Sequence, residues 1–343
     1  MAGFSRLIFV VLDAFPHDFV SAQWTPTLWS LAEEGGWARD GGRSILAAST
    51  YPNHATFITG AEPSRHLVYT NRALRDGDLR PAREVGPAAP TLFQECRDAG
   101  RKSVGVFGDQ NLVGVCGATE ADAHWPPLGV LPDDAPKGEL GYGADRAVVA
   151  ALDAMDLAEA EFVFVQLDEV DTARHLRGPL GDAVLEQCRA TDAALGEILA
   201  RFRNRWGETL VIVVSDHDHE AVNPGAIDLA SEVEARGLDL KVDHEGTSAL
   251  VVGEIAEAQL LDLPGVAESL ALSPGVRLVW GGPGQQFGID WGLAAQHGSP
   301  RTMKQLAVVG GGHPAAESLA KQICTASPRA TDWAERARTF LAL

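Results

Sequence analysis

The stretch LIFVVLD at residues 7–13 decides the fold, because six apolar residues end in a single carboxylate, Asp13. Short apolar runs bounded by polar residues are typical of strands buried on both faces. Two later runs of the same kind, at residues 162–167 and 209–215, are followed by acidic and histidine side chains: Asp171, His175, Asp216 and His217. Ligands collect at the carboxyl ends of parallel strands, so we expect all these side chains to meet at one edge of a sheet.

Helical patterns lie between the expected strands. Thr25 suits a helix cap, Pro26 the first helical position and Gly35 the stop. Further helices are expected over residues 91–101, 142–156 and 183–203, and further strands over 103–107 and 306–309. This alternation predicts an α/β fold, a three-layer α/β/α sandwich with a mostly parallel central sheet.

Composition limits the partners of the chain. Its 343 residues, 45% of them hydrophobic, are enough for a large core. The net charge of −19 argues against a nucleic-acid polymer as partner, whereas a small anion can bind where metal ions reverse the local field. No apolar stretch reaches the roughly 18 residues of a membrane span, so no membrane partner is expected. The sequence does not indicate an oligomeric state.

Two stretches interrupt the alternation of strands and helices. Residues 110–140 are rich in Gly, Pro and Asp and are expected to form a long loop. Residues 222–295 contain their own helical pattern and short strands, and we interpret them as a small cap-like insertion over the active site. The catalytic core is then expected to comprise residues 1–221 and 296–343.

The cellular compartment is expected to be the cytoplasm. The first apolar run leads straight into Asp13 and lacks the plan of a signal peptide. The four cysteines are widely spaced and form no CxxC pair, so reduced and mostly buried thiols are expected: Cys96, Cys116, Cys188 and Cys324.

Spacing suggests which side chains share a metal ion. Asp171 and His175 are four residues apart, which places both on one face of a helical turn. Asp216 and His217 come directly after a very apolar strand, and His219 is a fallback ligand in the same segment. Each pattern taken alone has a structural alternative. Asp171 and His175 could form a surface ion pair, and Asp216 and His217 could be the polar end of a strand.

The segment STYPNHATFITG at residues 49–60 supplies a candidate nucleophile, Thr50. A threonine hydroxyl becomes useful when a metal takes its proton or when it heads a helix. We expect a helix from Asn53, which places an anion near helix-terminal N–H groups. The structural alternative is that Thr50 serves only as a helix N-cap.

The order of these motifs resembles the alkaline phosphatase superfamily, and most closely its type I phosphodiesterase / nucleotide pyrophosphatase branch. The resemblance covers residues 6–71 and returns at 162–175, 209–217 and 296–310. It rests on motifs that are individually weak but occur in the right order: Asp13, Thr50-Tyr-Pro-Asn-His54, Asp171-x-x-x-His175, Ser215-Asp-His217 and His297-Gly.

The resemblance implies an alkaline-phosphatase-like fold and a two-metal site. One ion would be held by Asp171, His175 and His297, which we prefer to His313 as the late histidine. The other ion would be held by Asp13, Thr50, Asp216 and His217. Zinc suits such mixed His/carboxylate sets, and manganese remains open. Asn71 stands where this branch places an amide that binds a phosphoryl oxygen, and a covalent phosphothreonine is implied.

One departure from related sequences bears on the substrate. Some relatives carry a Lys-Asp-Lys or Lys-Asp-Arg element after the strand at 103–107, where this chain has Gly108-Asp-Gln110. A phosphate monoester carries more charge than a diester, and the two basic side chains of this element would act as a clamp on that charge. Loss of this basic clamp favours phosphodiester or nucleotide pyrophosphate bonds of a small phosphorylated metabolite. Three nearby arginines offer compensation: Arg65, Arg72 and Arg75. The alternatives are therefore a phosphomonoesterase or phosphonate hydrolase and, third, a non-catalytic metal-binding homologue.

Overall fold

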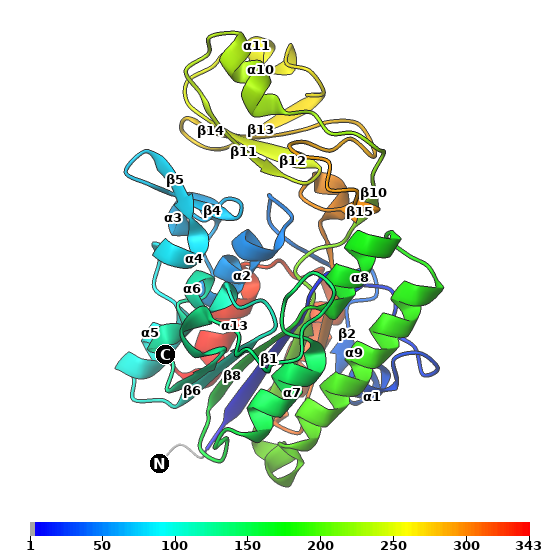
Figure 1. Ribbon diagram of the computed structural model, residues 1–343. Coiled ribbons are helices and arrows are strands. Elements are labelled where there is room, and N and C mark those ends of the chain that lie inside the picture. The colour runs from blue at the N-terminus through cyan, green and yellow to red at the C-terminus, as the bar shows by residue number, and fades with distance from the viewer. Residues whose placement is uncertain (1–3) are drawn as a thin grey trace.

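The computed structural model describes residues 4–343, and Figure 1 shows a layered core that carries a smaller cap at one end. A seven-stranded sheet lies at the centre of the core, in the order β2-β17-β9-β1-β8-β6-β7. Its strands are β1 (Arg6–Leu12), β2 (Gly36–Trp37), β6 (Ser103–Phe107), β7 (Ala123–Trp125), β8 (Phe162–Leu167), β9 (Thr209–Val214) and β17 (Ala307–Gly310). The three apolar runs that the sequence analysis starts from are therefore neighbouring central strands.

The sheet is mostly parallel, as predicted. β1 pairs in parallel with β8 and β9, and β6 pairs in parallel with β8 and β7. Only β17 runs antiparallel to its two neighbours, β9 and β2. Leu12 lies level with Leu167, and Val11 lies level with Val214. This register brings the residues that follow the three central strands to the same edge of the sheet.

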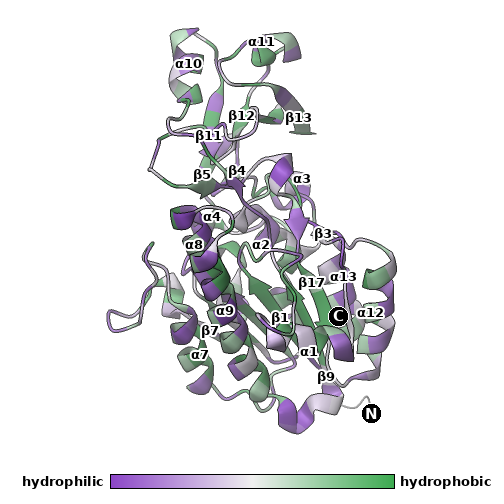
Figure 2. Cartoon of the chain, turned by 90° about the vertical axis from the view of Figure 1, so that its right-hand side faces the viewer, coloured by the Kyte–Doolittle hydropathy of each residue, from purple (hydrophilic) through white to green (hydrophobic). Residues whose placement is uncertain are grey.

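Helices cover both faces of the sheet, which confirms the three-layer sandwich. On one face Phe9 stacks on Phe164 with ring centroids 5.1 Å apart, and on the other face Val10 belongs to the same buried cluster as Leu195. Figure 2 shows the apolar strands enclosed between helices whose outer sides are polar. The first face is covered by α2 (Thr50–Thr59), α5 (Leu92–Asp98), α6 (Leu112–Val115), α12 (Pro314–Thr325) and α13 (Asp332–Leu341). The second is covered by α1 (Pro26–Glu34), α7 (Asp145–Asp153), α8 (Glu169–Arg177) and α9 (Asp182–Ala200).

Local sequence signals set most helix boundaries. α1 begins at Pro26 and ends before Gly35, as predicted. Thr91 forms a capping box with Gln94 at the start of α5, although this helix ends at Asp98 and not at 101. The expectation of a loop over residues 110–140 is wrong in part, since this stretch contains α6 and the edge strand β7. The short pairing of β7 with β6 depends on a neighbour in the sheet, which no local pattern reveals.

Residues 222–295 form most of the cap. The cap sheet has the order β11-β12-β14-β13 and is antiparallel. A two-stranded ribbon of β10 and β15 stands at its base and joins it to the core. The elements are β10 (Glu220–Ala221), α10 (Leu229–Ala235), β11 (Lys241–Glu245), β12 (Ser248–Val252), α11 (Glu257–Leu261), β13 (Glu268–Ser273), β14 (Val276–Trp280) and β15 (Ala295–Gln296).

The cap sheet packs on the core through its inner face. Tyr69 of the core lies in one buried cluster with Leu250 and Leu278 of the cap, and its hydroxyl bonds to the Ser273 hydroxyl at 2.8 Å. Short elements of the core complete this side of the molecule: β3 (Gly42–Arg43), α3 (Pro63–His66), β4 (Arg72–Arg75), β5 (Asp78–Pro81), α4 (Ala82–Val85) and β16 (Lys304–Gln305). The cap is therefore held against the carboxyl end of the sheet (Figure 1).

Within the described residues, no helix has both the length and the apolar character needed to cross a membrane.

His66 gives a stability test that does not involve the site. The ring is fully buried, its Nδ1 accepts from the Val68 N–H at 3.1 Å, and its Nε2 lies 3.0 Å from the Thr56 hydroxyl. Burial, helped by the charge of Arg75, lowers the pKa of His66 to about 3. Below pH 6.5 the His66 imidazole binds a proton in the unfolded chain but stays neutral in the folded chain. The free energy of unfolding therefore decreases as the pH falls.

We expect wild type to lose about 2 kcal/mol more than His66→Asn between pH 7.5 and pH 5.0, since 1.36 kcal/mol corresponds to one pKa unit. Urea unfolding at the two pH values measures this difference. Asn204→Ala, at an exposed position, serves as the control and should keep the wild-type pH slope. Equal slopes for wild type and His66→Asn would contradict the assignment.

Candidate active site

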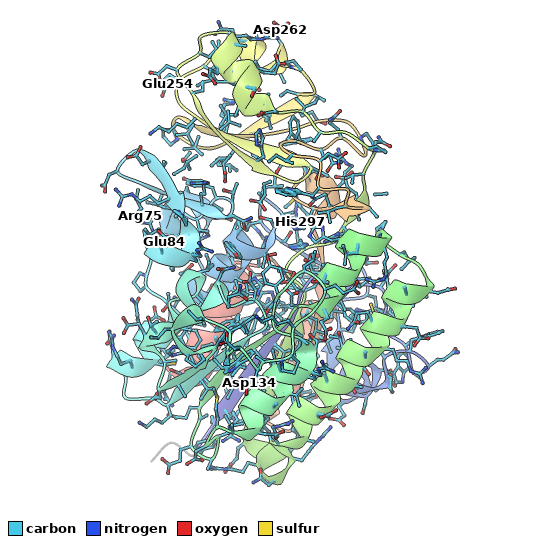
Figure 3. All side chains as sticks on the ribbon, viewed as in Figure 1. Arg75, Glu84, Asp134, Glu254, Asp262 and His297 are labelled. Carbon is cyan, nitrogen blue, oxygen red and sulfur yellow. The ribbon has the colours of Figure 1, made fainter. Side chains whose placement is uncertain are left out.

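The polar side chains predicted from the strand ends gather below the cap. Asp13 follows β1, and its N–H donates to the carbonyl of Leu167 at 2.9 Å, which fixes it beside the end of β8. Asp216 and His217 follow β9, and Thr50 begins α2. His297, which is labelled in Figure 3, lies in the same region at the base of the cap.

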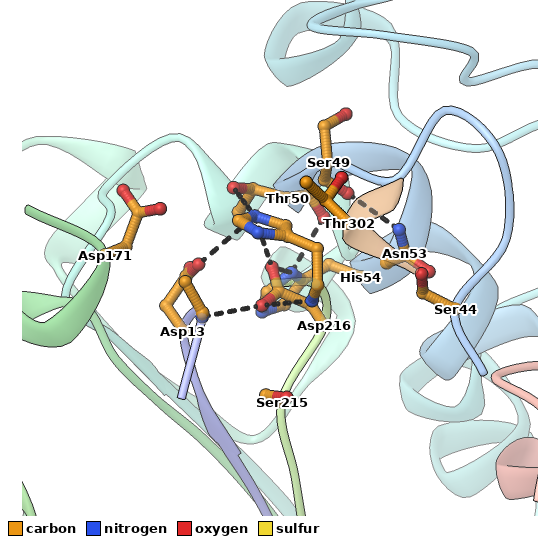
Figure 4. Close-up of polar contacts among 12 residues, drawn as sticks. Asp13, Ser44, Ser49, Thr50, Asn53, His54, Asp171, Ser215, Asp216 and Thr302 are labelled. Carbon is orange, nitrogen blue, oxygen red and sulfur yellow. Dashed lines mark hydrogen bonds and ion pairs between the residues drawn. The ribbon is translucent and has the colours of Figure 1, made fainter. Parts of the chain in front are cut away.

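Four of these residues form what we call the nucleophile-side group: Asp13, Thr50, Asp216 and His217. The Nε2 atom of His217 lies 3.2 Å from the Thr50 hydroxyl, 3.4 Å from Asp216 Oδ2 and 3.6 Å from Asp13 Oδ1. Figure 4 shows Asp13, Thr50 and Asp216 in the same region. Three separate elements of the core thus bring their polar atoms to one point. The ligand set that the resemblance implies around Thr50 is assembled in space.

The other set belongs to what we call the histidine-rich group: Asp171, His175, His219 and His297. Asp171 and His175 lie one turn apart on α8, with Oδ2 and Nε2 3.3 Å from each other. The Nδ1 atom of His175 bonds to the Ala295 carbonyl at 2.9 Å, which turns Nε2 toward the carboxylate. The ligand-capable atoms of all four residues lie within 4.8 Å of one another. The ring of His297 also lies 4.1 Å from that of His217, so the two groups are adjacent.

His219 is the fallback ligand of the sequence analysis, and its Nε2 lies 2.7 Å from Asp171 Oδ1. The chain between β9 and β10 contains no helix, and side chains two apart project to the same side where the backbone is strand-like. His217 and His219 follow this rule, with ring centroids 5.6 Å apart, whereas Asp218 between them pairs with Arg174. The alternation Asp-His-Asp-His was therefore a usable signal. His313 contacts Phe340 instead, so the preference for His297 as the late histidine agrees with the geometry.

Burial dominates the electrostatics of both groups. It raises the pKa of Asp13 and of Asp216, and it raises the pKa of Asp171 to about 6. The charges of neighbouring carboxylates add to the effect at Asp13 and Asp171. It lowers the pKa of His217 and of His297 well below the ordinary value. The imidazoles are therefore held neutral, which is the form that binds metal ions.

The donor set fits divalent metal ions. Asp13 Oδ1 and Asp216 Oδ2 are buried and lack a hydrogen-bond partner among the described residues. Unpartnered carboxylate oxygens in a protein interior are costly unless a cation offsets them. With neutral imidazoles beside them, these oxygens make a donor set of the kind that zinc prefers.

Supporting residues hold the ligand candidates in place. Gln166, the one amide in the apolar run 162–167, donates to Asp13 Oδ2 at 2.8 Å and accepts from the Asp109 N–H at 3.0 Å. The buried guanidinium of Arg174 donates to the Ala14 carbonyl and to Asp218. The sequence analysis missed both residues. A lone amide inside an apolar strand was the only available signal for the first, and none marked the second.

The helix that carries the nucleophile candidate begins earlier than expected. α2 starts at Thr50, three residues before Asn53, and Ser49 occupies the N-cap position. The cap alternative for Thr50 is therefore wrong. Asn53 is structural, since its Oδ1 accepts from the Ile45 N–H at 2.9 Å. The half-buried Thr50 hydroxyl lies at the positive end of the helix dipole, which favours negative charge there.

Asn71 lies where cap and core meet. Its side chain is exposed, while its backbone N–H donates to Glu245 of β11 at 3.0 Å. Glu245 is fully buried, and burial together with the charge of Asp243 raises the pKa of its carboxyl to about 8. The sequence analysis did not single out Glu245, because its burial arises only when the cap closes on the core.

Two of the three arginines that could replace the missing basic clamp, Arg72 and Arg75, are engaged by other groups. Arg72 pairs with Asp243 at 3.2 Å, and Arg75 donates to the Gly86 carbonyl at 2.5 Å. Gly108 has no room for a side chain, since a Cβ there would lie 2.9 Å from the Gly143 carbonyl oxygen. The packing around Gly108 therefore leaves no space for a basic side chain at this position.

The fold and the two groups define a phosphohydrolase-type centre of the alkaline phosphatase kind. The chain belongs to the type I phosphodiesterase / nucleotide pyrophosphatase family, a family of hydrolases whose sequence model matches residues 7–262. Among curated proteins, mouse ectonucleotide pyrophosphatase/phosphodiesterase family member 3 is 23% identical over 185 residues. Venom phosphodiesterase of Macrovipera lebetinus is 24% identical over 191 residues. The matches cover 51% and 53% of this chain but only 20% and 21% of those longer proteins.

Solved structures share the fold over nearly the whole chain. Murine ectonucleotide pyrophosphatase/phosphodiesterase 5, in an inactive form in complex with AMP, superposes with a TM-score of 0.73 at 14% identity, covering 99% of this chain and 96% of that chain. Phosphonoacetate hydrolase from Sinorhizobium meliloti, in complex with phosphonoacetate, has a TM-score of 0.68 at 15% identity, covering 98% and 96%. At these identities the likeness establishes the fold.

Proposed function

We propose that this protein is a two-metal hydrolase that cleaves phosphodiester or nucleotide pyrophosphate bonds of a small metabolite, with Thr50 as nucleophile. The observation that carries the proposal is the position of the Thr50 hydroxyl, 3.2 Å from His217 Nε2 and at the start of a helix. Family membership supports the reaction class. Zinc is the proposed ion, with manganese as the alternative.

The ligand candidates divide between two ions as their positions suggest. Asp13, Thr50, Asp216 and His217 would hold one ion, and Asp171, His175 and His297 would hold the other. When bound, the two ions would lower the pKa of the Thr50 hydroxyl and offset charge on the phosphoryl oxygens.

The residues of the chain then perform two displacements. The Thr50 oxygen forms a bond to phosphorus while the bond to the leaving-group oxygen breaks, which gives a phosphothreonine and releases the leaving group. Water next forms a bond to phosphorus, and the bond to Thr50 breaks. The N-terminal N–H groups of α2 and the amide of Asn71 would orient the phosphoryl oxygens.

Diester specificity is proposed because Arg72, Arg75 and position 108 offer no free positive charge for a second phosphate charge. Arg72 is paired with Asp243, and a side chain at Gly108 would strike backbone. A phosphonate or monoester hydrolase is the alternative, and the likeness in fold to phosphonoacetate hydrolase is the reason to test it. A non-catalytic homologue ranks third.

The test compares a monoester and a diester that share one leaving group, 4-nitrophenyl phosphate and bis(4-nitrophenyl) phosphate, with zinc-loaded protein. We expect kcat/KM for the diester to be at least about 10-fold higher, because one poorly compensated charge in the site corresponds to 1.4 kcal/mol or more. Phosphonoacetate is assayed in parallel. Preference for the monoester or for phosphonoacetate would overturn the diester assignment in favour of the alternative.

Asn71 gives a second prediction. Its side chain is exposed, and a hydrogen bond to a charged oxygen contributes about 1.5–3 kcal/mol. We expect Asn71→Ala to lower kcat/KM for the diester about 10- to 100-fold with zinc content unchanged. The exposed Asn204 is the control, since Asn204→Ala should behave as wild type. Wild-type kinetics for Asn71→Ala would exclude the proposed contact.

We also propose that the protein acts in the cytoplasm. In the described chain all four cysteines are free, and three of them are buried. Fractionation of the native host, with the protein detected by antibody, tests this proposal, and recovery outside the cytoplasm would refute it.

A further inference from the structure

We infer that His219 is a fourth protein ligand in the histidine-rich group, so that one ion is bound by one carboxylate and three imidazoles. This inference rests on the metal dependence in the proposed function. The resemblance implies only three ligands for that ion, Asp171, His175 and His297. With His219 included, the histidine-rich group would bind its ion through one more imidazole than the resemblance implies.

The positions of the four side chains carry the inference. His219 Nε2 lies 2.7 Å from Asp171 Oδ1, while His175 Nε2 lies 3.3 Å from the other oxygen of the same carboxylate. The ring of His219 lies 4.5 Å from the ring of His175 and 5.2 Å from that of His297. Ligand atoms around a tetrahedral zinc ion with bonds of 2.0–2.1 Å are about 3.3 Å apart. The two contacts of Asp171 are close to this spacing, and the ligand-capable atoms of all four residues lie within 4.8 Å of one another.

Two neighbouring residues, Asp218 and Arg174, hold His219 in this orientation. Asp218 Oδ1 accepts from the His219 backbone N–H at 2.8 Å and also receives the guanidinium of Arg174. Arg174 in turn donates to the Ala14 carbonyl, next to Asp13. The buried Arg174–Asp218 pair thus fixes the backbone with the imidazole turned inward. The side chain of His219 is completely buried, and its Nδ1 has no hydrogen-bond partner among residues 4–343.

The simpler alternative is that His219 only orients Asp171 by a hydrogen bond. Loss of zinc affinity does not separate the two roles, because removing such a supporting partner also weakens metal binding about 10- to 100-fold. The number of imidazoles bound to the ion does separate them. A ligand contributes one imidazole to that number, and an orienting residue contributes none.

A four-ligand site has chemical consequences. Four protein ligands leave only an added fifth position for water or a phosphoryl oxygen. Three imidazoles favour zinc over manganese or magnesium, whereas the nucleophile-side group offers mostly oxygen atoms and suits harder ions better. We therefore expect the two sites to differ in metal preference, with zinc retained longest by the histidine-rich group.

The experiment counts imidazoles by zinc X-ray absorption spectroscopy. The full chain carries Asp216→Asn, which weakens the nucleophile-side group, and receives one equivalent of zinc. We expect three imidazoles per zinc in this protein and two after the further change His219→Ala. The control is His124→Ala, on β7 and outside both groups, which should leave the count at three. A count of two both with and without His219 would overturn the inference.

Cobalt substitution provides a second readout. Loss of a ligand from the Co²⁺-loaded protein should change the visible d–d bands of His219→Ala but not those of His124→Ala. Unchanged bands in His219→Ala would also overturn the inference. Turnover is not used as evidence, so failure of the proposed hydrolysis and failure of the fourth-ligand assignment are distinguishable. A count of three imidazoles in a protein that does not cleave diesters would retain the metal site and reject the reaction.

Discussion

Thr50→Ala is expected to lower kcat/KM for the aryl diester by at least about 10³-fold, because removal of a covalent nucleophile leaves only binding and electrostatic assistance to attack by water. The hydroxyl lies 3.2 Å from His217 Nε2 at the first residue of α2. The carboxylates and imidazoles of both groups remain. We therefore expect the variant to bind two zinc ions per chain at saturating metal.

The kinetics and the zinc content of Thr50→Ala are measured on the same preparation. Thr50→Ser should recover part of the activity, since it restores a hydroxyl at the same place. Thr325→Ala, which changes an exposed threonine of α12, should be indistinguishable from wild type. Turnover of Thr50→Ala above a tenth of the wild-type value would show that another group is the nucleophile.

Asp216→Asn is expected to have opposite effects on activity and on the stability of the metal-free protein. Asp216 is completely buried, and burial raises the pKa of its carboxyl above the ordinary value. Above that raised pKa the metal-free folded protein contains a desolvated charge close to Asp13, so its stability falls as the pH rises. Asparagine removes the charge and keeps an oxygen for the Ala14 N–H, which Asp216 Oδ1 accepts at 3.0 Å.

We expect Asp216→Asn to stabilise the metal-free protein by about 1–2 kcal/mol at pH 8, with a smaller effect at pH 5, because it removes a desolvated charge. Urea unfolding in the presence of a chelator measures the difference. With zinc present, kcat/KM should fall at least about 10²-fold, since a metal ligand is lost. Asp134→Asn, at an exposed loop position, is the control for both measurements. A less stable metal-free Asp216→Asn protein would contradict the electrostatic argument.

The sheet edge explains why so much of the site was predictable. Asp13 and Asp216 follow strands whose residues are all buried, and the register of β1 with β8 and β9 brings their ends together. Parallel strands ending in polar residues have few other arrangements. The predicted ligand candidates were therefore found in two adjacent groups, although each motif was weak by itself.

Residues that act through tertiary contacts were not predictable in the same way. Glu245 is buried only because β11 of the cap meets Asn71 of the core. Arg174 looks like a surface residue of α8 until Asp218 and the Ala14 carbonyl enclose it. In the cap, Trp280 and Phe287 fill apolar clusters, whereas Trp291 is 72% exposed. Similar residues thus have different environments that no local pattern distinguishes.

The sequence by itself determined the layered α/β core, because buried strands and amphipathic helices have different apolar periods, and it determined which strand ends carry carboxylates and imidazoles. Only the tertiary structure decided the start of α2 at Thr50, the inclusion of His219 beside Asp171, and the loss of space at Gly108. The physical reason is that hydrophobic periodicity is a local property of the chain. Hydrogen bonds, charge pairs and steric limits between distant segments exist only after the chain has folded.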